Sequence, residues 1–354
     1  MTKILFLPGD GIGPEIVQAS HRVLQAVSSL YDLKLEFHWR TIGFQSLEKH
    51  GTTITEKTLL AARSADGILL GPVSHNEYPP REHGGLNPSA ELRNGLDLYA
   101  NVRPAVTPLG FKGPTGKPMD LVVVRENTEG FYADRNMPSG PAEHLVTNDV
   151  AIALRRITRN ASLRIAESAF EHAKIRRGKV TAVHKANVLR TSCGLFLECC
   201  RSVAALYPDI EYEEQLVDSM AAMLVRQPEA YDVIVTTNMF GDILSDLASE
   251  LAGSLGMAPS LNVGSEHAMA QAQHGSAPQI AGKNIANPIS MISSASMLLA
   301  WLATQKGRPE FLRASQSIDA AITDALAAPE KRTEDLRGPA TTSEFTDYLL
   351  SMLG

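Results

Sequence analysis

Cysteine is scarce in this sequence, and no two cysteines have the spacing of a metal-binding or redox motif. The chain of 354 residues contains three, Cys193, Cys199 and Cys200. Neighbouring cysteines rarely bond to each other, and a sparse, odd set is typical of a reducing compartment. We therefore expect three free thiols that fill apolar space on one helix.

Long apolar runs and an excess of positive charge are also missing. The most apolar stretch, 289–303, is interrupted by four serines and is too short to cross a bilayer, so it predicts a buried helix. The apolar run at 4–7 is too short for a signal peptide. A formal net charge of −6 offers no electrostatic reason to bind nucleic acid or an anionic membrane. We expect a soluble, cytoplasmic protein with neither as a partner.

What the sequence does contain is a repeated alternation of short apolar runs and helical patterns. The runs lie at 4–7, 67–70, 121–124, 180–183 and 233–236, and each ends in turn or polar residues. This alternation predicts an α/β fold with mostly parallel strands. The chain is longer than one hydrophobic core usually organises, so we expect two domains.

One long helix is predicted from Val150 onward. Apolar residues at 150, 154, 157, 161 and 165 recur at helical spacing. Asn148 or Asp149 would cap its N-terminus.

The first apolar run leads into a glycine-rich turn, GDGIG at 9–13. A Rossmann dinucleotide fingerprint would need its third glycine at position 14, where Pro14 stands. Proline suits the first turn of a helix. The segment therefore predicts a turn followed by a helix, but not a Rossmann fold.

Three arginines could form a carboxylate-binding cluster. Arg93 falls on a predicted helix, Arg103 where a strand begins, and Arg125 directly after the run at 121–124. Guanidinium groups hold carboxylates through paired hydrogen bonds, so three of them could bind a di- or tricarboxylate. Taken singly, each is more commonly a surface ion-pair partner.

Asp242 and Asp246 are four residues apart and so share one face of a predicted helix. Their charges repel unless a cation lies between them, and oxygen ligands indicate Mg²⁺ or Mn²⁺ rather than zinc. A solvated helix face is the alternative.

Lys185, at the end of a predicted strand, could act as a base beside a cation, although spacing alone favours a surface lysine. The glycine-rich loop at 274–288 could wrap a nucleotide.

Together these segments resemble the β-decarboxylating dehydrogenases, the family of isocitrate, homoisocitrate, 3-isopropylmalate and tartrate/D-malate dehydrogenases. The resemblance runs from the turn at 9–13 to RTEDL at 332–336, and so covers essentially the whole chain. The string TTNMFGDILSD at 236–246 is highly specific.

The resemblance implies a role for each of these residues. Arg93, Arg103 and Arg125 would hold the substrate carboxylates. Tyr132 would protonate the enolate, and Lys185 would help to remove the hydroxyl proton. The other implied residues are the metal ligands Asp218, Asp242 and Asp246, the substrate-side residues Asn87 and Ser89, and the cofactor-side residues Ile12, His274, Gly275, Ala277, Gln279 and Asn287.

The resemblance also implies the fold and the assembly. The family has an α/β fold of the isocitrate/isopropylmalate dehydrogenase type with two domains, and its active site lies in the interdomain cleft. The first domain would comprise 1–98 plus 254–354, with both termini and the cofactor loop, and the second 99–253, with the dimerisation, metal and catalytic residues. In this family the lysine and the third aspartate come from the partner subunit, so an obligate homodimer with shared active sites is implied.

The implied reaction is the NAD- or NADP-dependent oxidative decarboxylation of a malate-type 2-hydroxy acid with Mg²⁺ or Mn²⁺. Leu86, Ser89 and Ala90 stand where isopropylmalate enzymes build an apolar pocket from a glutamate and two leucines. Asn87 and Ser89 match the serine and asparagine of isocitrate enzymes in exchanged order, and hydrogen-bonding side chains suit a polar substrate arm. Isocitrate or homoisocitrate is therefore favoured over 3-isopropylmalate and over tartrate or D-malate, whose tryptophan-bearing pattern is absent.

The cofactor side departs from the family pattern in two places. Gln279 stands where NAD enzymes usually carry aspartate and NADP enzymes carry lysine followed by tyrosine. A neutral side chain offers no cation to a 2′-phosphate, which favours NAD. The segment at 269–273 also lacks the glutamate–proline pair that is common in relatives.

Two other classes of function stay open. One is a metal-dependent 2-hydroxy-acid dehydrogenase that does not decarboxylate. The other is a non-catalytic dimer that binds metabolites. The retention of Tyr132, Lys185 and the three aspartates argues against the second, because binding alone needs no proton donor.

Overall fold

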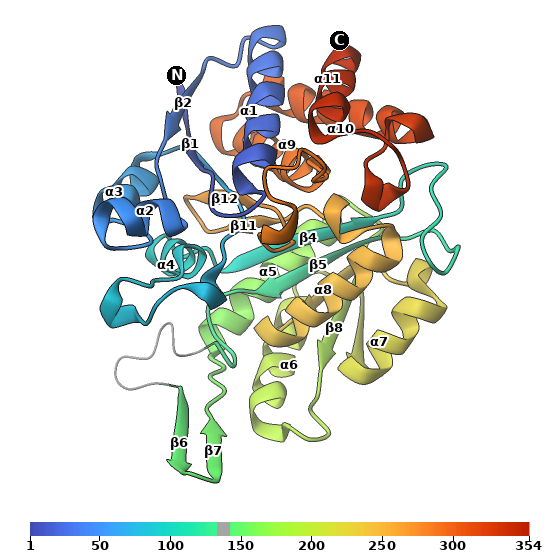
Figure 1. Cartoon of the computed structure of the whole chain (residues 1–354). Helices are drawn as coiled ribbons and strands as arrows, with labels where there is room; N and C mark the ends of the chain where they lie inside the picture. The colour runs from blue at the N-terminus through green and yellow to red at the C-terminus, as the bar shows by residue number, and fades with distance from the viewer. Residues whose placement is uncertain (133–141, 354) are drawn as a thin grey trace. The chain divides into compact units, whose positions relative to one another are not determined.

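The computed structural model describes residues 1–132 and 142–353, and the chain divides into two compact units (elements labelled in Figure 1). Unit 1 comprises Met1–Leu96, Pro108–Phe111 and Gly253–Gly354, and unit 2 comprises Asp97–Thr107 and Lys112–Ala252. The two main boundaries lie within two residues of those that the resemblance implied, after 98 and after 253. The short segment 108–111 returns to unit 1.

Unit 1 is built on a sheet covered by helices. Strands β2, β1, β3 and β12 lie side by side in that order and run parallel, and β11 pairs antiparallel with β12. The elements of unit 1 are β1 (Thr2–Leu7), β2 (Leu35–Trp39), β3 (Gly67–Leu70), β11 (Leu261–Val263), β12 (Ala268–Gln271), α1 (Gly13–Leu30), α2 (Gly43–His50), α3 (Glu56–Ser64), α4 (Pro88–Gly95), α9 (Ile289–Lys306), α10 (Pro309–Ala327) and α11 (Thr342–Met352).

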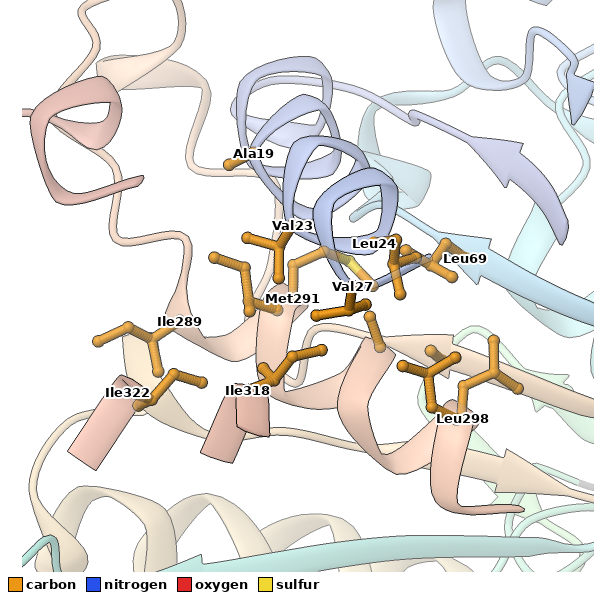
Figure 2. Packing of buried hydrophobic residues seen from close by; sticks show 14 of the residues in the cluster. Ala19, Val23, Leu24, Val27, Leu69, Ile289, Met291, Leu298, Ile318 and Ile322 are labelled. Atoms are coloured by element: carbon orange, nitrogen blue, oxygen red, sulfur yellow. The ribbon is translucent and has the colours of Figure 1, made fainter. Parts of the chain in front are cut away.

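The core of unit 1 forms where α1, α9 and α10 pack together. Figure 2 shows Val23 and Val27 of α1 gathered with Met291 of α9 and Ile318 of α10. The prediction of a buried helix at 289–303 is confirmed, because α9 is buried along most of its length. Three of its serines, Ser290, Ser294 and Ser296, form hydrogen bonds inside the protein; Ser294, for example, donates to the carbonyl of Ser290 at 2.7 Å. Among the described residues, no helix has both the length and the apolar composition that crossing a membrane requires.

Unit 2 contains a second group of strands, with β4, β5, β10, β8 and β9 side by side in that order. β5, β10, β8 and β9 run parallel, and β4 is antiparallel to β5. The three cysteines of α6 are buried and free, as predicted. The elements of unit 2 are β4 (Ala100–Val106), β5 (Asp120–Glu126), β6 (Glu143–Thr147), β7 (Val150–Ala153), β8 (Lys179–His184), β9 (Glu211–Leu216), β10 (Val233–Thr236), α5 (Arg159–Lys174), α6 (Arg190–Ala204), α7 (Val217–Arg226) and α8 (Asn238–Ala252).

The helix predicted from residue 150 is wrong at its start. Val150–Ala153 forms strand β7, which pairs antiparallel with β6 and projects from the rest of unit 2 (Figure 1). Asn148 and Asp149, expected as the cap of a helix, form the turn between these two strands. Helix α5 begins only after Thr158, whose side-chain oxygen caps it. The apolar residues of this segment also alternate with period two, which is the pattern of a strand, and the segment adopts that structure.

Replacing Ile318 by alanine tests the packing of α10 in the core of unit 1. Ile318 is 0% exposed, and truncating a large buried aliphatic side chain leaves a cavity, so we expect the free energy of unfolding to fall by about 2–5 kcal/mol. Urea unfolding followed by circular dichroism measures the loss. Leu312→Ala on the same helix is the matched control, because Leu312 is 44% exposed and should cost less than about 1 kcal/mol. Equal losses in the two variants would contradict this packing.

Candidate active site

A buried arginine of unit 2, Arg103 on β4, holds the carboxylates of helix α8. Its Nη1 donates to Ser245 Oγ at 2.8 Å, and it lies 3.4 Å from Asp242 Oδ1 and 3.3 Å from Asp246 Oδ1. Burial lowers the pKa of Arg103 to about 10, with a further contribution from the positive charge of Arg125. The guanidinium is still protonated at neutral pH, so its charge is balanced by the two aspartates.

A second buried arginine, Arg125 on β5, binds the first turn of the same helix. Its Nε and Nη2 donate to Asn238 Oδ1 at 2.9 and 2.7 Å, and its Nη1 forms an ion pair with Asp242. Gly241 permits this approach, because a Cβ there would lie 2.7 Å from Cβ and Cγ of Arg125. The hydroxyl of Tyr132 donates to Asp242 Oδ2 at 3.2 Å. Arginine and tyrosine therefore converge on one carboxylate.

Five of the residues implied by the resemblance are thus brought together within unit 2, namely Arg103, Arg125, Tyr132, Asp242 and Asp246. The two aspartates lie one turn apart on α8, as their spacing predicted, with side chains 38% and 52% exposed. Carboxylate oxygens on an accessible helix face fit Mg²⁺ or Mn²⁺. Two carboxylates supply part of the coordination shell of such an ion, so other groups would have to complete it.

Lys185 and Asp218 form a different ion pair in unit 2. Lys185 follows β8, Asp218 lies in the first turn of α7, and Lys185 Nζ is 2.6 Å from Asp218 Oδ1. The hydrogen bond from Lys185 lowers the pKa of Asp218. In the described part of the chain, no three His, Cys, Asp or Glu side chains are grouped so that they could hold a metal. Within one subunit, Asp218 therefore does not join Asp242 and Asp246.

In unit 1, two of the predicted substrate-side residues meet at a glutamine. Gln271 Oε1, at the end of β12, accepts hydrogen bonds from Ser89 Oγ at 3.1 Å and Arg93 Nη2 at 3.2 Å, both on α4. Asn87 instead caps this helix, because its Oδ1 accepts from Ala90 N at 3.2 Å. Sequence reasoning missed Gln271 as a site residue. The signal in the sequence that could have pointed to Gln271 was the absence, at 269–273, of the glutamate–proline pair that is common in relatives.

Unit 1 also contains a cavity of about 440 Å³ beside the turn that follows β12. Five of the six residues expected on the cofactor side line it, and the exception, Gln279, is an exposed residue of the adjoining turn Pro278–Ile280. The sequence interpretation gave no role to several other lining residues. The cavity is lined by Ile12, Ser254, Gly256, His274, Gly275, Ala277, Ile280, Ile285, Ala286, Asn287, Glu334 and Asp335.

The polar groups of this cavity are fixed by hydrogen bonds at its rim. Asp335 Oδ2 accepts from Asn287 Nδ2 at 3.0 Å and from Ser254 Oγ at 2.9 Å. Burial lowers the pKa of His274, so its imidazole is neutral at pH 7. A largely apolar pocket with a few fixed polar groups suits the base and ribose of a nucleoside.

A nucleoside-sized pocket in one unit and an arginine–aspartate–tyrosine cluster in the other fit an oxidoreductase that uses a nucleotide. The sequence profile of the isocitrate/isopropylmalate dehydrogenase family matches residues 3–349, and the chain belongs to this family. The family assignment, the fold class and the enzyme class predicted from the sequence are thereby confirmed.

The relatives carry several substrate names. The chain is 41% identical to 3-isopropylmalate dehydrogenase of Sulfurisphaera tokodaii, over 99% of each chain. It is also 41% identical to catalytic subunit 5 of the mitochondrial NAD isocitrate dehydrogenase of Arabidopsis thaliana, over 100% of this chain and 88% of the relative. The crystal structure of isocitrate dehydrogenase from Methylococcus capsulatus superposes with a TM-score of 0.88 at 38% identity, covering 100% of this chain and 99% of that one.

Replacing Gly241 by alanine tests the close approach of α8 to Arg125. The added methyl group would displace buried atoms of Arg125 (2.7 Å), so we expect a loss of about 1–3 kcal/mol and a lower melting temperature by circular dichroism. Gly194→Ala is the control, because Gly194 is also helical and a Cβ there meets nothing within 4 Å. That variant should be neutral or stabilised by up to about 1 kcal/mol. If Gly241→Ala melts like the control, the described contact is incorrect.

Proposed function

We propose that this protein catalyses the oxidative decarboxylation of a malate-type 2-hydroxy acid with NAD⁺ or NADP⁺ and with Mg²⁺ or Mn²⁺. The observation that carries the proposal is the convergence of Arg103, Arg125 and Tyr132 on the two carboxylates of α8. Anion-binding groups, a proton donor and potential metal ligands lie together there. Relatives named for isocitrate, homoisocitrate and 3-isopropylmalate support this reaction type.

Each of the residues implied by the resemblance has a separate role in the proposed reaction. Arg93, Arg103 and Arg125 bind the substrate carboxylates through charge-assisted hydrogen bonds. Lys185 assists removal of the proton from the 2-hydroxyl group. A bound nicotinamide cofactor would supply the acceptor for the hydride of carbon 2. The carboxylate on carbon 3 then leaves as carbon dioxide, and its bonding electrons form an enolate. Tyr132 donates a proton to carbon 3, which yields the 2-oxo acid.

A divalent cation would be held by Asp242 and Asp246, together with Asp218 from a second copy of the chain. Bound there, it would supply stabilisation of the negative charge that develops on the 2-oxygen. The fit rests on the oxygen donors of α8. Because Asp242 and Asp246 are paired with arginines in the protein alone, binding of the cation replaces part of that charge balance.

We favour isocitrate or homoisocitrate among the possible substrates. Ser89 and Arg93 present a hydroxyl and a guanidinium next to the amide of Gln271, and such groups suit a carboxylate-bearing arm better than an isopropyl group. 3-Isopropylmalate and tartrate or D-malate are the alternatives, and they share the same malate core.

We favour NAD over NADP as the cofactor. Gln279 is neutral, and two acidic residues, Glu334 and Asp335, line the cavity. Carboxylates disfavour the additional phosphate of NADP by like-charge repulsion. The two basic residues close to these in the sequence, Lys283 and Arg337, are not among the lining residues, so they offer no positive charge to such a phosphate.

We further propose that the enzyme is a homodimer with shared active sites and acts in the cytoplasm. The hairpin β6–β7 exposes large apolar side chains, with Leu145 71%, Val146 57% and Ile152 48% exposed. Surfaces of this kind are typical of protein–protein contacts. The position of Asp218, apart from Asp242 and Asp246 within one chain, supports a site that a second copy completes.

A spectrophotometric screen tests the reaction. The purified protein is given isocitrate, homoisocitrate, 3-isopropylmalate, D-malate or tartrate, with Mn²⁺ and with either NAD⁺ or NADP⁺. We expect reduced nicotinamide with isocitrate or homoisocitrate and NAD⁺, and one equivalent of carbon dioxide for each reduced nucleotide. Addition of EDTA should abolish the signal, because the aspartates would then lack their cation.

The alternative outcomes of the screen are distinct. Reduced nucleotide without carbon dioxide would indicate a dehydrogenase that does not decarboxylate. Metabolite binding without any reduced nucleotide would indicate a non-catalytic dimer, and the proposed reaction would be wrong.

Mixed dimers test whether the sites are shared. Lys185→Ala and Asp242→Ala chains should each be inactive alone, but a mixed dimer would have one site that contains neither change. Random mixing should restore about a quarter of the wild-type activity, since half of the dimers are mixed and each has one intact site. Lys185→Ala mixed with Asp218→Ala is the control, because both residues would be given to the partner and no intact site would form. Equal activity of the two mixtures would contradict shared sites.

A further inference from the structure

Helix α8 begins with a buried amide side chain, Asn238, which is 1% exposed and bonds to two different segments of unit 2. Its Oδ1 accepts hydrogen bonds from Nε and Nη2 of Arg125 at 2.9 and 2.7 Å. Its Nδ2 donates to the main-chain carbonyl of Glu129 at 2.9 Å. The guanidinium requires an acceptor and the carbonyl requires a donor, so the two partners together fix the orientation of the amide.

The segment that Nδ2 holds leads directly to Tyr132. The carboxylate of Glu129 accepts from N and Oγ1 of Thr158 at 2.8 and 2.9 Å. Gly130 follows in the left-handed conformation, with a φ of +88°, and a Cβ there would lie 3.2 Å from Cβ of Asn238. The turn therefore passes close to the start of α8, and its bonds fix the path of the main chain two residues before the tyrosine.

Arg125 contacts the same tyrosine through its side chain. Its Cζ lies 5.7 Å from the centre of the Tyr132 ring, and both side chains contact the carboxylate of Asp242. Arg125 is 2% exposed, so solvent is poorly placed to replace its bonds to the amide. Asn238 thus fixes both the guanidinium beside the ring and the main chain that carries the ring.

We propose that Asn238 is a positioning residue that couples Arg125, which binds a substrate carboxylate, to the proton donor Tyr132. One neutral side chain sets the distance between the group that holds the substrate and the group that protonates carbon 3. An aspartate in its place would keep the acceptor and lose the donor, and the shorter serine would not span both partners. This inference rests on the proposed function, because it gives Asn238 a part in the proton transfer by Tyr132.

Product formed in deuterium oxide tests the coupling. Tyr132 gives a deuteron to carbon 3 and recovers one from the solvent, so the wild type should label one configuration of that carbon, as read by NMR of the 2-oxo acid. Asn238→Asp removes the donor to Glu129 and should displace the tyrosine. Water would then protonate the enolate from either face, so we expect the stereospecificity to be lost, with deuterium in both configurations.

Thr181→Val is the matched control for the loss of a buried hydrogen bond in unit 2. Thr181 is 0% exposed, and its Oγ1 donates to Glu213 Oε1 at 2.8 Å, outside the site. This variant should keep the single configuration even where its melting temperature falls. Wild-type stereospecificity in Asn238→Asp would overturn the proposal.

A fluorine NMR measurement tests the position of the tyrosine without any turnover. With 3-fluorotyrosine incorporated at position 132, the wild type and Thr181→Val should each give one narrow resonance. Asn238→Asp and the neutral Asn238→Ser should both give a broadened or additional resonance, because the ring samples more than one position. If Asn238→Asp does not fold, Asn238→Ser must show the change. An unchanged resonance overturns the coupling, whereas a wild type without turnover contradicts only the proposed reaction.

Discussion

The balance of charge around helix α8 is the constraint on which the site of unit 2 depends. Arg103 and Arg125 are buried, and a buried guanidinium is costly unless a carboxylate accompanies it. Asp242 is the carboxylate that both arginines reach. This arrangement requires α8 to begin directly beside β5, and Gly241 provides the space. The fold of unit 2 and its proposed chemistry are therefore coupled, because the groups that balance the arginines are also the oxygen donors proposed for a cation.

The same charge balance explains why one chain looks incomplete as an enzyme. Two arginines and a divalent cation together carry four positive charges, and two carboxylates neutralise only two of them. Further anions are therefore needed. In the proposed reaction the substrate would supply some of them, and Asp218 of a second copy would supply another. Within one chain, Asp218 is paired with Lys185 at 2.6 Å. In the proposed dimer, the partner would deliver this lysine and this metal ligand together, because they are already paired within one chain.

The elements that the sequence predicted correctly are those with a single dominant period. The apolar runs at 121–124, 180–183 and 233–236 became the buried parallel strands of unit 2. The segment after 150 fits both the helical and the strand period, and tertiary pairing with β6 decided it. Within the site, Asp242 and Asp246 followed from helical spacing, whereas the meeting of Arg103 with Ser245 depends on pairing across 142 residues that no local pattern encodes. Gln271 was missed because the absent glutamate–proline pair marks a departure from relatives without indicating which side chains bond to the amide that stands there.

Unit 1 places uncharged side chains next to charged ones at two positions. The nucleotide-sized cavity combines neutral His274 with acidic residues, and the α4 side combines Arg93 with a neutral glutamine. A phosphate-rich cofactor and a carboxylate-rich substrate are both anions, so a protein of net charge −6 must place its positive charges selectively.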